Sequence, residues 1–231
     1  MFSGGLNLPN QLTLARVFMV PVFVVLLSFD EWWCYWLGYA VFTVATITDY
    51  YDGKIARERN LITNFGKLLD PVADKVLVTA AFIMMMTLPA AQDPGVAKAI
   101  REIVLPTPTS AQDPVVRALL IPGWTIVAIL AREFLVTGVR SLAASDGVVI
   151  AADNFGKAKT VIQMVYIFVF LFLAGAEHFV VAYAADYATV YRTALEQTSF
   201  WGMVFVALYT VYTGVRFMRA NWGILQLGNR T

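Results

Sequence analysis

Four aspartates at one end of two neighbouring apolar segments are the residues in this sequence best suited to chemistry. They form two pairs, Asp49 with Asp52 and Asp70 with Asp74. Residues three or four positions apart on an α-helix share a face, so each pair presents two carboxylates together. A short turn between two antiparallel helices would let the two pairs face each other.

Four carboxylates at close range stay ionised together only when cations lie among them. Oxygen ligands favour Mg²⁺ or Mn²⁺ over zinc, and two divalent ions would balance the four negative charges. Two such ions about 3.5–4 Å apart are suited to phosphoryl transfer. The spacing therefore predicts a two-metal site that acts on a phosphate ester.

The residues next to the aspartates fit a phosphate-bearing ligand. Gly53 lies four residues after Asp49 on the same helix face, where a missing side chain lets a ligand approach the backbone. Arg57 follows one turn later and can pair with a phosphate. In the alternative interpretation, the aspartates only flank membrane spans and pair with nearby lysines and arginines. The joint spacing of all four favours a ligand site.

The composition shows which elements must position these residues. Of 231 residues, 59% are hydrophobic and 14% are charged, which is about half the charged share of an ordinary soluble domain. This excludes a disordered chain, a basic nucleic-acid-binding domain and a typical soluble enzyme. A membrane-spanning helix needs about 20 apolar residues. Six stretches qualify: residues 10–29, 33–57, 70–89, 121–143, 156–176 and 199–219. The sequence therefore predicts an all-α integral membrane protein, with one domain over residues 1–231.

The basic residues predict the orientation. With both termini in the cytoplasm, twelve of the seventeen lysines and arginines lie at cytoplasmic ends and four lie outside, in agreement with the positive-inside rule. The aspartates then lie at the cytoplasmic face of the cell (inner) membrane. A long loop at about residues 90–120 lies outside, and so does the segment 177–198, whose apolar part we expect on the membrane surface.

Residues 49–74 also carry a motif. They read D-Y-Y-D-G-K-I-A-R, then eight residues, then G-K-L-L-D-P-V-A-D. At every fixed position this resembles the signature of the CDP-alcohol phosphatidyltransferase family, D-x2-D-G-x2-A-R-x8-G-x3-D-x3-D. The resemblance implies a fold of six membrane helices, a homodimer, and metal-dependent transfer of a phosphatidyl group from CDP-diacylglycerol to an alcohol.

The same resemblance implies roles for individual residues. The four aspartates would bind the metal ions, and Asp74 would also act as general base. The cytidine diphosphate part of the donor would be contacted by Gly53, Arg57 and Thr63 and, at its phosphates, by Asn10 and Thr13.

Residues 7–16, 131–140 and 156–163 look like the members of this family whose acceptor is glycerol 3-phosphate. That acceptor brings a phosphate dianion, so cations should be ready to bind it. The candidates are Arg140, Lys157, Lys159 and Arg132. Alternatively, the first three only flank membrane spans on the cytoplasmic side. Arg132, inside the fourth span, could form an intramembrane ion pair with Glu133.

Two other functions stay open at this point. A member of the same family could use another acceptor, such as inositol phosphate, serine or phosphatidylglycerol. A cation transporter could use the four aspartates as its ion site. A transporter more often places such charges near the membrane midplane, whereas these four gather at one face.

Overall fold

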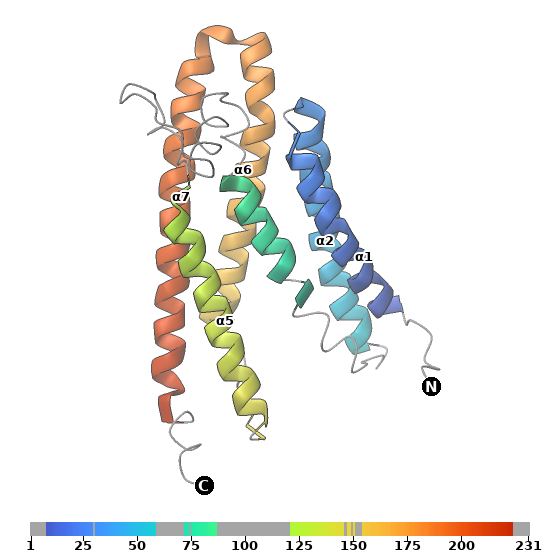
Figure 1. Ribbon diagram of the computed structural model, residues 1–231, viewed down its shortest axis with the longest axis vertical. Coiled ribbons are helices and arrows are strands. Elements are labelled where there is room, and N and C mark those ends of the chain that lie inside the picture. Colours follow the sequence, from blue (N-terminus) through green and yellow to red (C-terminus); the bar gives the residue numbers. More distant parts are fainter. Residues whose placement is uncertain are drawn as a thin grey trace, which may run out of the picture. The chain divides into compact units, whose positions relative to one another are not determined.

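The computed structural model describes residues 8–29, 31–58, 72–73, 75–86, 121–145, 147–148, 150 and 154–223. Every regular element in these ranges is an α-helix (Figure 1), which confirms the all-α prediction. The long helices are α1 (Leu8–Leu27), α2 (Trp32–Glu58), α5 (Gly123–Ser145), α6 (Asn154–Tyr183) and α7 (Ala185–Ala220). A shorter helix covers Lys75–Met86. Each predicted span overlaps one of these helices, and the predicted loop at 90–120 lies outside the described residues.

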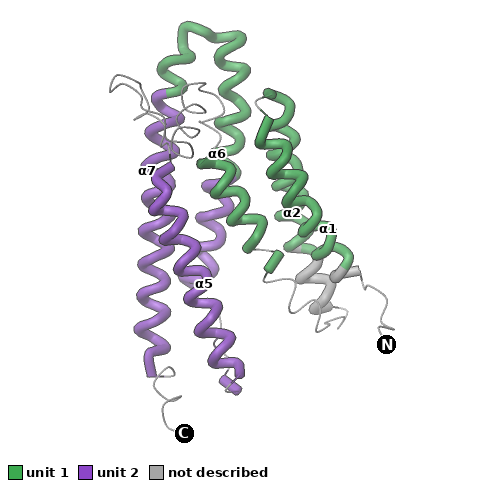
Figure 2. Tube along the Cα trace, viewed as in Figure 1, with its two compact units in different colours: residues 1–118, 168–192 green, residues 119–167, 193–231 purple. Residues whose placement is uncertain are grey.

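The chain divides into two compact units (Figure 2). Unit 1 comprises residues 1–118 and 168–192, and unit 2 comprises residues 119–167 and 193–231. The helices α6 and α7 contribute to both units. The single domain expected over residues 1–231 stays a prediction.

Unit 1 is built on the pair α1 and α2 and on aromatic packing. The short connection between the two helices makes them neighbours, and the Phe23 and Phe42 rings meet with centroids 5.7 Å apart. A Cβ atom on Gly38 of α2 would lie 2.8 Å from the Leu27 side chain of α1, so a small residue is needed at this contact. A second row of rings on α2 packs against Phe168, Phe172 and Phe179 of α6.

The segment 177–198 is almost entirely helical, because α6 continues to Tyr183 and α7 starts at Ala185. Its place at the membrane surface stays a prediction. No glycine or proline interrupts residues 176–201, and contacts hold the two helix ends together within unit 1. Arg192 Nε donates to Glu177 Oε1 at 2.7 Å, and Tyr191 Oη donates to the Leu173 carbonyl at 2.7 Å. Two charged residues of this segment, Glu177 and Arg192, therefore pair across two helices.

Two of the described helices, α6 and α7, are long and apolar enough to cross a membrane, with mean hydropathies of 2.1 and 1.3. They contain 30 and 36 residues. At 1.5 Å per residue these are about 45 and 54 Å long, so both exceed the hydrocarbon core of a bilayer, which is about 30 Å thick.

Unit 2 combines α5 with the first part of α6 and most of α7. Val136 and Val139 of α5 pack with Phe217 of α7. A Cβ atom on Gly202 would lie 2.6 Å from the Tyr166 ring of α6, so α6 and α7 also approach closely where a glycine faces a large side chain. Small residues at such contacts are typical of helices packed in membranes.

The helix α5 ends in a cap formed around Gly147. This glycine has a φ of 75°, a conformation in which other residues are strained. The Val148 amide donates to the Ala143 carbonyl at 2.8 Å, and the Gly147 amide donates to the Ala144 carbonyl at 3.1 Å. These bonds satisfy carbonyls that the end of a helix leaves without partners.

Candidate functional site

The end of α2 carries the first aspartate pair. Asp49, Asp52, Gly53 and Arg57 all lie within the helix Trp32–Glu58; that the two carboxylates share a face stays a prediction. The side chains of Asp52, Arg57 and Asn10 lie outside what the structure describes. Thr63, Asp70 and Asp74 lie outside the described residues altogether.

Asp49 forms an ion pair with Arg16 of α1, within unit 1. The Arg16 side chain is 1% exposed and the Asp49 side chain 43%. A buried guanidinium requires an anion close by, so this pair links α1 to the C-terminal part of α2. Thr13, a predicted donor contact, is buried one turn before Arg16 on α1. From the sequence, Arg16 was included only in the segment 7–16, and Asp49 was not identified as its partner.

The exposed carboxylate of Asp49 fits a hard divalent cation, for which oxygen is the preferred ligand. Within the described ranges, histidine, cysteine, aspartate and glutamate side chains nowhere gather in groups of three or more. Three of the four predicted ligands have side chains outside those ranges, so the two-metal site stays a prediction.

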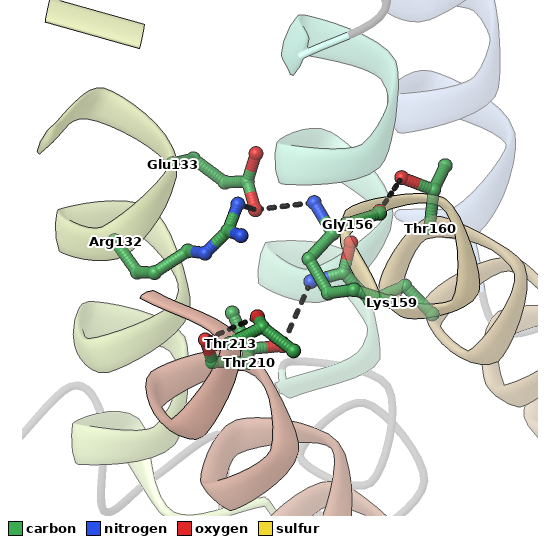
Figure 3. Close-up of polar contacts among 8 residues, drawn as sticks. Arg132, Glu133, Gly156, Lys159, Thr160, Thr210 and Thr213 are labelled. Carbon is green, nitrogen blue, oxygen red and sulfur yellow. Dashed lines mark hydrogen bonds and ion pairs between the residues drawn. The ribbon is translucent and has the colours of Figure 1, made fainter. Parts of the chain in front are cut away.

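In unit 2, three charged side chains from α5 and α6 meet (Figure 3). Glu133 Oε1 accepts a hydrogen bond from Lys159 Nζ and another, at 3.4 Å, from Arg132 Nη1. The side chains of Lys159, Arg132 and Glu133 are 7%, 11% and 20% exposed. We call Arg132, Glu133 and Lys159 the charged cluster. It brings together two of the four predicted acceptor residues.

Glu133 was not among the predicted site residues. Its link to Lys159 joins residues 26 positions apart, and no local pattern gives such a pairing. The available signal was a carboxylate in the apolar middle of a span, since an ionisable residue there needs a partner and is often functional.

A layer of neutral polar groups lies beside the charged cluster. Gln163, one turn after Lys159 on α6, donates from Nε2 to Thr210 Oγ1 on α7 at 3.3 Å. Thr213 Oγ1 donates to the Thr210 carbonyl at 2.8 Å (Figure 3). All three side chains are buried, so the hydrogen bonds hold α6 against α7 next to the charges.

The other two predicted acceptor residues lie elsewhere in unit 2. Arg140 is about 12 Å further along α5 than Arg132, at 1.5 Å per residue, and its guanidinium lies over the Phe217 ring at 5.2 Å. In the part of the chain that the structure describes, Arg140 Nε is buried and has no hydrogen-bond acceptor. Lys157 is exposed.

The CDP-alcohol phosphatidyltransferase family matches residues 6–209, which is most of the chain. The protein therefore belongs to this family, whose members are membrane-bound and generally metal-dependent. The resemblance seen in the aspartate motif is confirmed.

Several relatives narrow the comparison within the family. A CDP-diacylglycerol–glycerol-3-phosphate 3-phosphatidyltransferase of Bacillus subtilis (strain 168) is 32% identical over 235 residues, which cover 96% of this chain and 99% of that protein. A protein of the same name from Rickettsia typhi is 36% identical over 68% of this chain and 72% of its own length. CDP-diacylglycerol–glycerol-3-phosphate 3-phosphatidyltransferase 2 of Arabidopsis thaliana is 35% identical over 73% of this chain and 66% of its own length.

Proposed function

We propose that the protein transfers the phosphatidyl group of CDP-diacylglycerol to glycerol 3-phosphate, giving phosphatidylglycerophosphate and CMP. The observation that carries this function is the similarity to the Bacillus subtilis enzyme, which extends over 96% of this chain. It covers the aspartate motif as well as the charged cluster in the second half of the sequence.

In the proposed reaction, the sn-1 hydroxyl of glycerol 3-phosphate attacks the lipid-side phosphorus of the donor. The bond from that phosphorus to the bridging oxygen breaks, and CMP leaves with the oxygen. Asp74 accepts the proton of the attacking hydroxyl. The four aspartates would hold two Mg²⁺ or Mn²⁺ ions, which would supply positive charge to stabilise the pyrophosphate.

The residues assigned to the donor bind CDP-diacylglycerol and hold it in place for the reaction. Arg16 holds the Asp49 carboxylate at the end of α2, where the remaining aspartates complete the predicted ligand set. Gly53, Arg57 and Thr63 bind the cytidine diphosphate, and Asn10 and Thr13 contact its phosphates from α1. Binding at these positions fixes the phosphorus for attack, so no covalent intermediate with the protein is needed.

The charged cluster and Arg140 are the proposed acceptor site. Arg132 and Lys159 bring two positive charges against the single negative charge of Glu133, and all three side chains are largely buried. A phosphate dianion would fit the excess positive charge. Arg140, whose buried Nε has no acceptor among the described residues, and the exposed Lys157 are further cations that we assign to the acceptor.

The setting of the reaction follows from the charge distribution. Six spans with both termini in the cytoplasm place the aspartates at the cytoplasmic face of the cell membrane, next to a soluble acceptor. The donor is drawn from the membrane lipids, no nucleic acid takes part, and the working form is a homodimer of single-domain chains.

The test is an acceptor panel with the purified protein. CDP-diacylglycerol is supplied with glycerol 3-phosphate, inositol phosphate, serine or phosphatidylglycerol, and CMP release is measured. We expect release with glycerol 3-phosphate alone. Release with a different acceptor would reassign the substrate within the family. Cation flux into proteoliposomes without any CMP release would support a transporter.

Removing single cations should weaken acceptor binding. A charge-assisted hydrogen bond contributes roughly 1.5–3 kcal/mol, so Arg140→Ala and Lys157→Ala should each raise the KM for glycerol 3-phosphate by about tenfold to more than a hundredfold. The KM for CDP-diacylglycerol should change little. Arg140→Lys should rescue partially, because an ammonium cannot bind two phosphate oxygens with a planar fork. If the KM for glycerol 3-phosphate stayed unchanged and only the protein level fell, both residues would serve to orient the membrane spans and would not bind the acceptor.

The close approach of α7 to Arg132 gives a test without any change of charge. A Cβ atom on Gly214 would lie 2.6 Å from Arg132 Cγ, so Gly214→Ala must displace the arginine. We expect the KM for glycerol 3-phosphate to rise about tenfold, or about 1.4 kcal/mol. Gly202→Ala is the matched control. Gly202 lies on α7, as Gly214 does, and its added Cβ would lie equally close, at 2.6 Å, to the Tyr166 ring of α6. If both variants changed only thermal stability, Arg132 would have no part in acceptor binding.

A further inference from the structure

The carboxylate of Glu133 lies between two cations in the middle of α5. It accepts hydrogen bonds from Lys159 Nζ on α6 and from Arg132 Nη1 on its own helix (Figure 3). A lysine ammonium sits on a flexible four-carbon stem and has no fixed direction of its own. The position of the Lys159 ammonium is therefore set by Glu133.

Glu133 also makes it possible for two cations to be buried together. The Lys159 and Arg132 side chains are 7% and 11% exposed, so water screens their mutual repulsion poorly. Removing one member of a buried ion pair leaves the other uncompensated. Without the carboxylate, electrostatic repulsion from Arg132 would move the flexible Lys159 ammonium away from the guanidinium.

Packing prevents Arg132 from leaving in the other direction. Its stem lies against Gly214 of α7, where a Cβ atom would come within 2.6 Å. Arg132 and Gly214 both border a cavity of about 640 Å³ between α5 and α7, whose walls, which include Leu135, Val211 and Val215, are almost entirely apolar. A guanidinium turned into that cavity would lose its hydrogen bonds, so Glu133 and the packing together give Arg132 a single direction.

We propose that Glu133 is a positioning residue for the acceptor, in a role that rests on the proposed function. It holds the Lys159 ammonium and the Arg132 guanidinium side by side, so that one phosphate group can bind both cations. The carboxylate itself contacts the two cations and leaves the net charge of the cluster at one positive unit. The ligand that fits this arrangement is a phosphate group, either that of glycerol 3-phosphate or inorganic phosphate.

A double-mutant cycle tests whether Glu133 acts through Lys159. Glu133→Gln and Lys159→Met should each raise the KM for glycerol 3-phosphate about tenfold, while the KM for CDP-diacylglycerol stays within about twofold. The double variant should raise the KM by clearly less than the product of the two single effects, because the carboxylate then has no ammonium to hold and positions Arg132 alone. Multiplied effects in the double variant would overturn the positioning role.

Two further variants separate positioning from a general loss of stability. Glu133→Asp keeps the buried negative charge but shortens the side chain by one methylene. It should therefore raise the KM for glycerol 3-phosphate less than Glu133→Gln does. It also provides the test if the glutamine variant does not fold. Glu177→Gln makes the same substitution at a buried carboxylate paired with Arg192 at 2.7 Å. It should lower the melting temperature and leave the KM for glycerol 3-phosphate unchanged.

A binding measurement separates failure of this role from failure of the proposed function. Inorganic phosphate, with no donor present, should raise the thermal unfolding midpoint of the purified protein and of Glu177→Gln. It should not do so for Glu133→Gln or Lys159→Met. If wild type prefers a different phosphate-bearing acceptor, the proposed function falls while this binding pattern stands. If phosphate protects Glu133→Gln as well as wild type, or protects neither, Glu133 does not position a phosphate site.

Discussion

Removal of divalent cations is expected to abolish CMP release by the purified protein. In the proposed site the four carboxylates would lie close together and repel each other, and among the described side chains Asp49 is paired with Arg16. The donor adds the negative charges of its pyrophosphate to the same place. Without cations the donor would be repelled, and the charge that develops on the leaving CMP would have no stabilisation.

The measurement is CMP release before and after treatment with EDTA. Adding Mg²⁺ or Mn²⁺ in excess should restore the rate, since both ions accept oxygen ligands. EDTA already saturated with Mg²⁺ is the control for effects of the chelator itself. Activity that survives thorough chelation would show that the aspartates do not act through two metal ions.

The helices were predictable because each depends on a continuous apolar run. All six predicted spans overlap a helix, and the place of Asp49 and Asp52 within one helix followed from the sequence alone. The segment 177–198 was not predictable from hydropathy. Its polar residues look like a loop one by one, and their pairing, as between Glu177 and Arg192, appears only when two helices are side by side.

The contacts between helices were the part that the sequence could not provide. Arg16 and Asp49 are 33 positions apart, and Glu133 and Lys159 are 26 apart. Which faces meet depends on the packing of whole helices, including the glycine contacts that let α7 approach α5 and α6. The charge of a side chain is known from its residue type alone, so the sequence was enough to identify the lysines and arginines proposed for the acceptor site. The ion pair of Arg132 with Glu133 was also expected and is confirmed, whereas the contact of Glu133 with Lys159 was not foreseen, because it depends on the packing of two helices.

Replacing the general base should have a larger effect on turnover than any acceptor variant. Asp74→Asn keeps the size of the side chain and removes both the base and one anionic metal ligand, so kcat should fall by at least ~10². Donor binding should weaken much less, because three aspartates and the residues around Gly53 remain. Asp49→Asn should instead damage both donor binding and turnover, since it removes a ligand and also the partner of the buried Arg16.

The comparison needs saturating metal, so that loss of a ligand is separated from loss of the base. Asp186→Asn is the matched control, because Asp186 is an exposed aspartate in the first turn of α7, and its amide variant should keep the wild-type rate. Single-turnover CMP release with excess enzyme then reports the chemical step without product dissociation. If Asp74→Asn released CMP at nearly the wild-type rate under these conditions, proton removal from the acceptor would have to be assigned to another group. A second contrary outcome is that Asp49→Asn lowers turnover and leaves the affinity for CDP-diacylglycerol unchanged. The carboxylate that Arg16 orients would then not be needed for binding the donor.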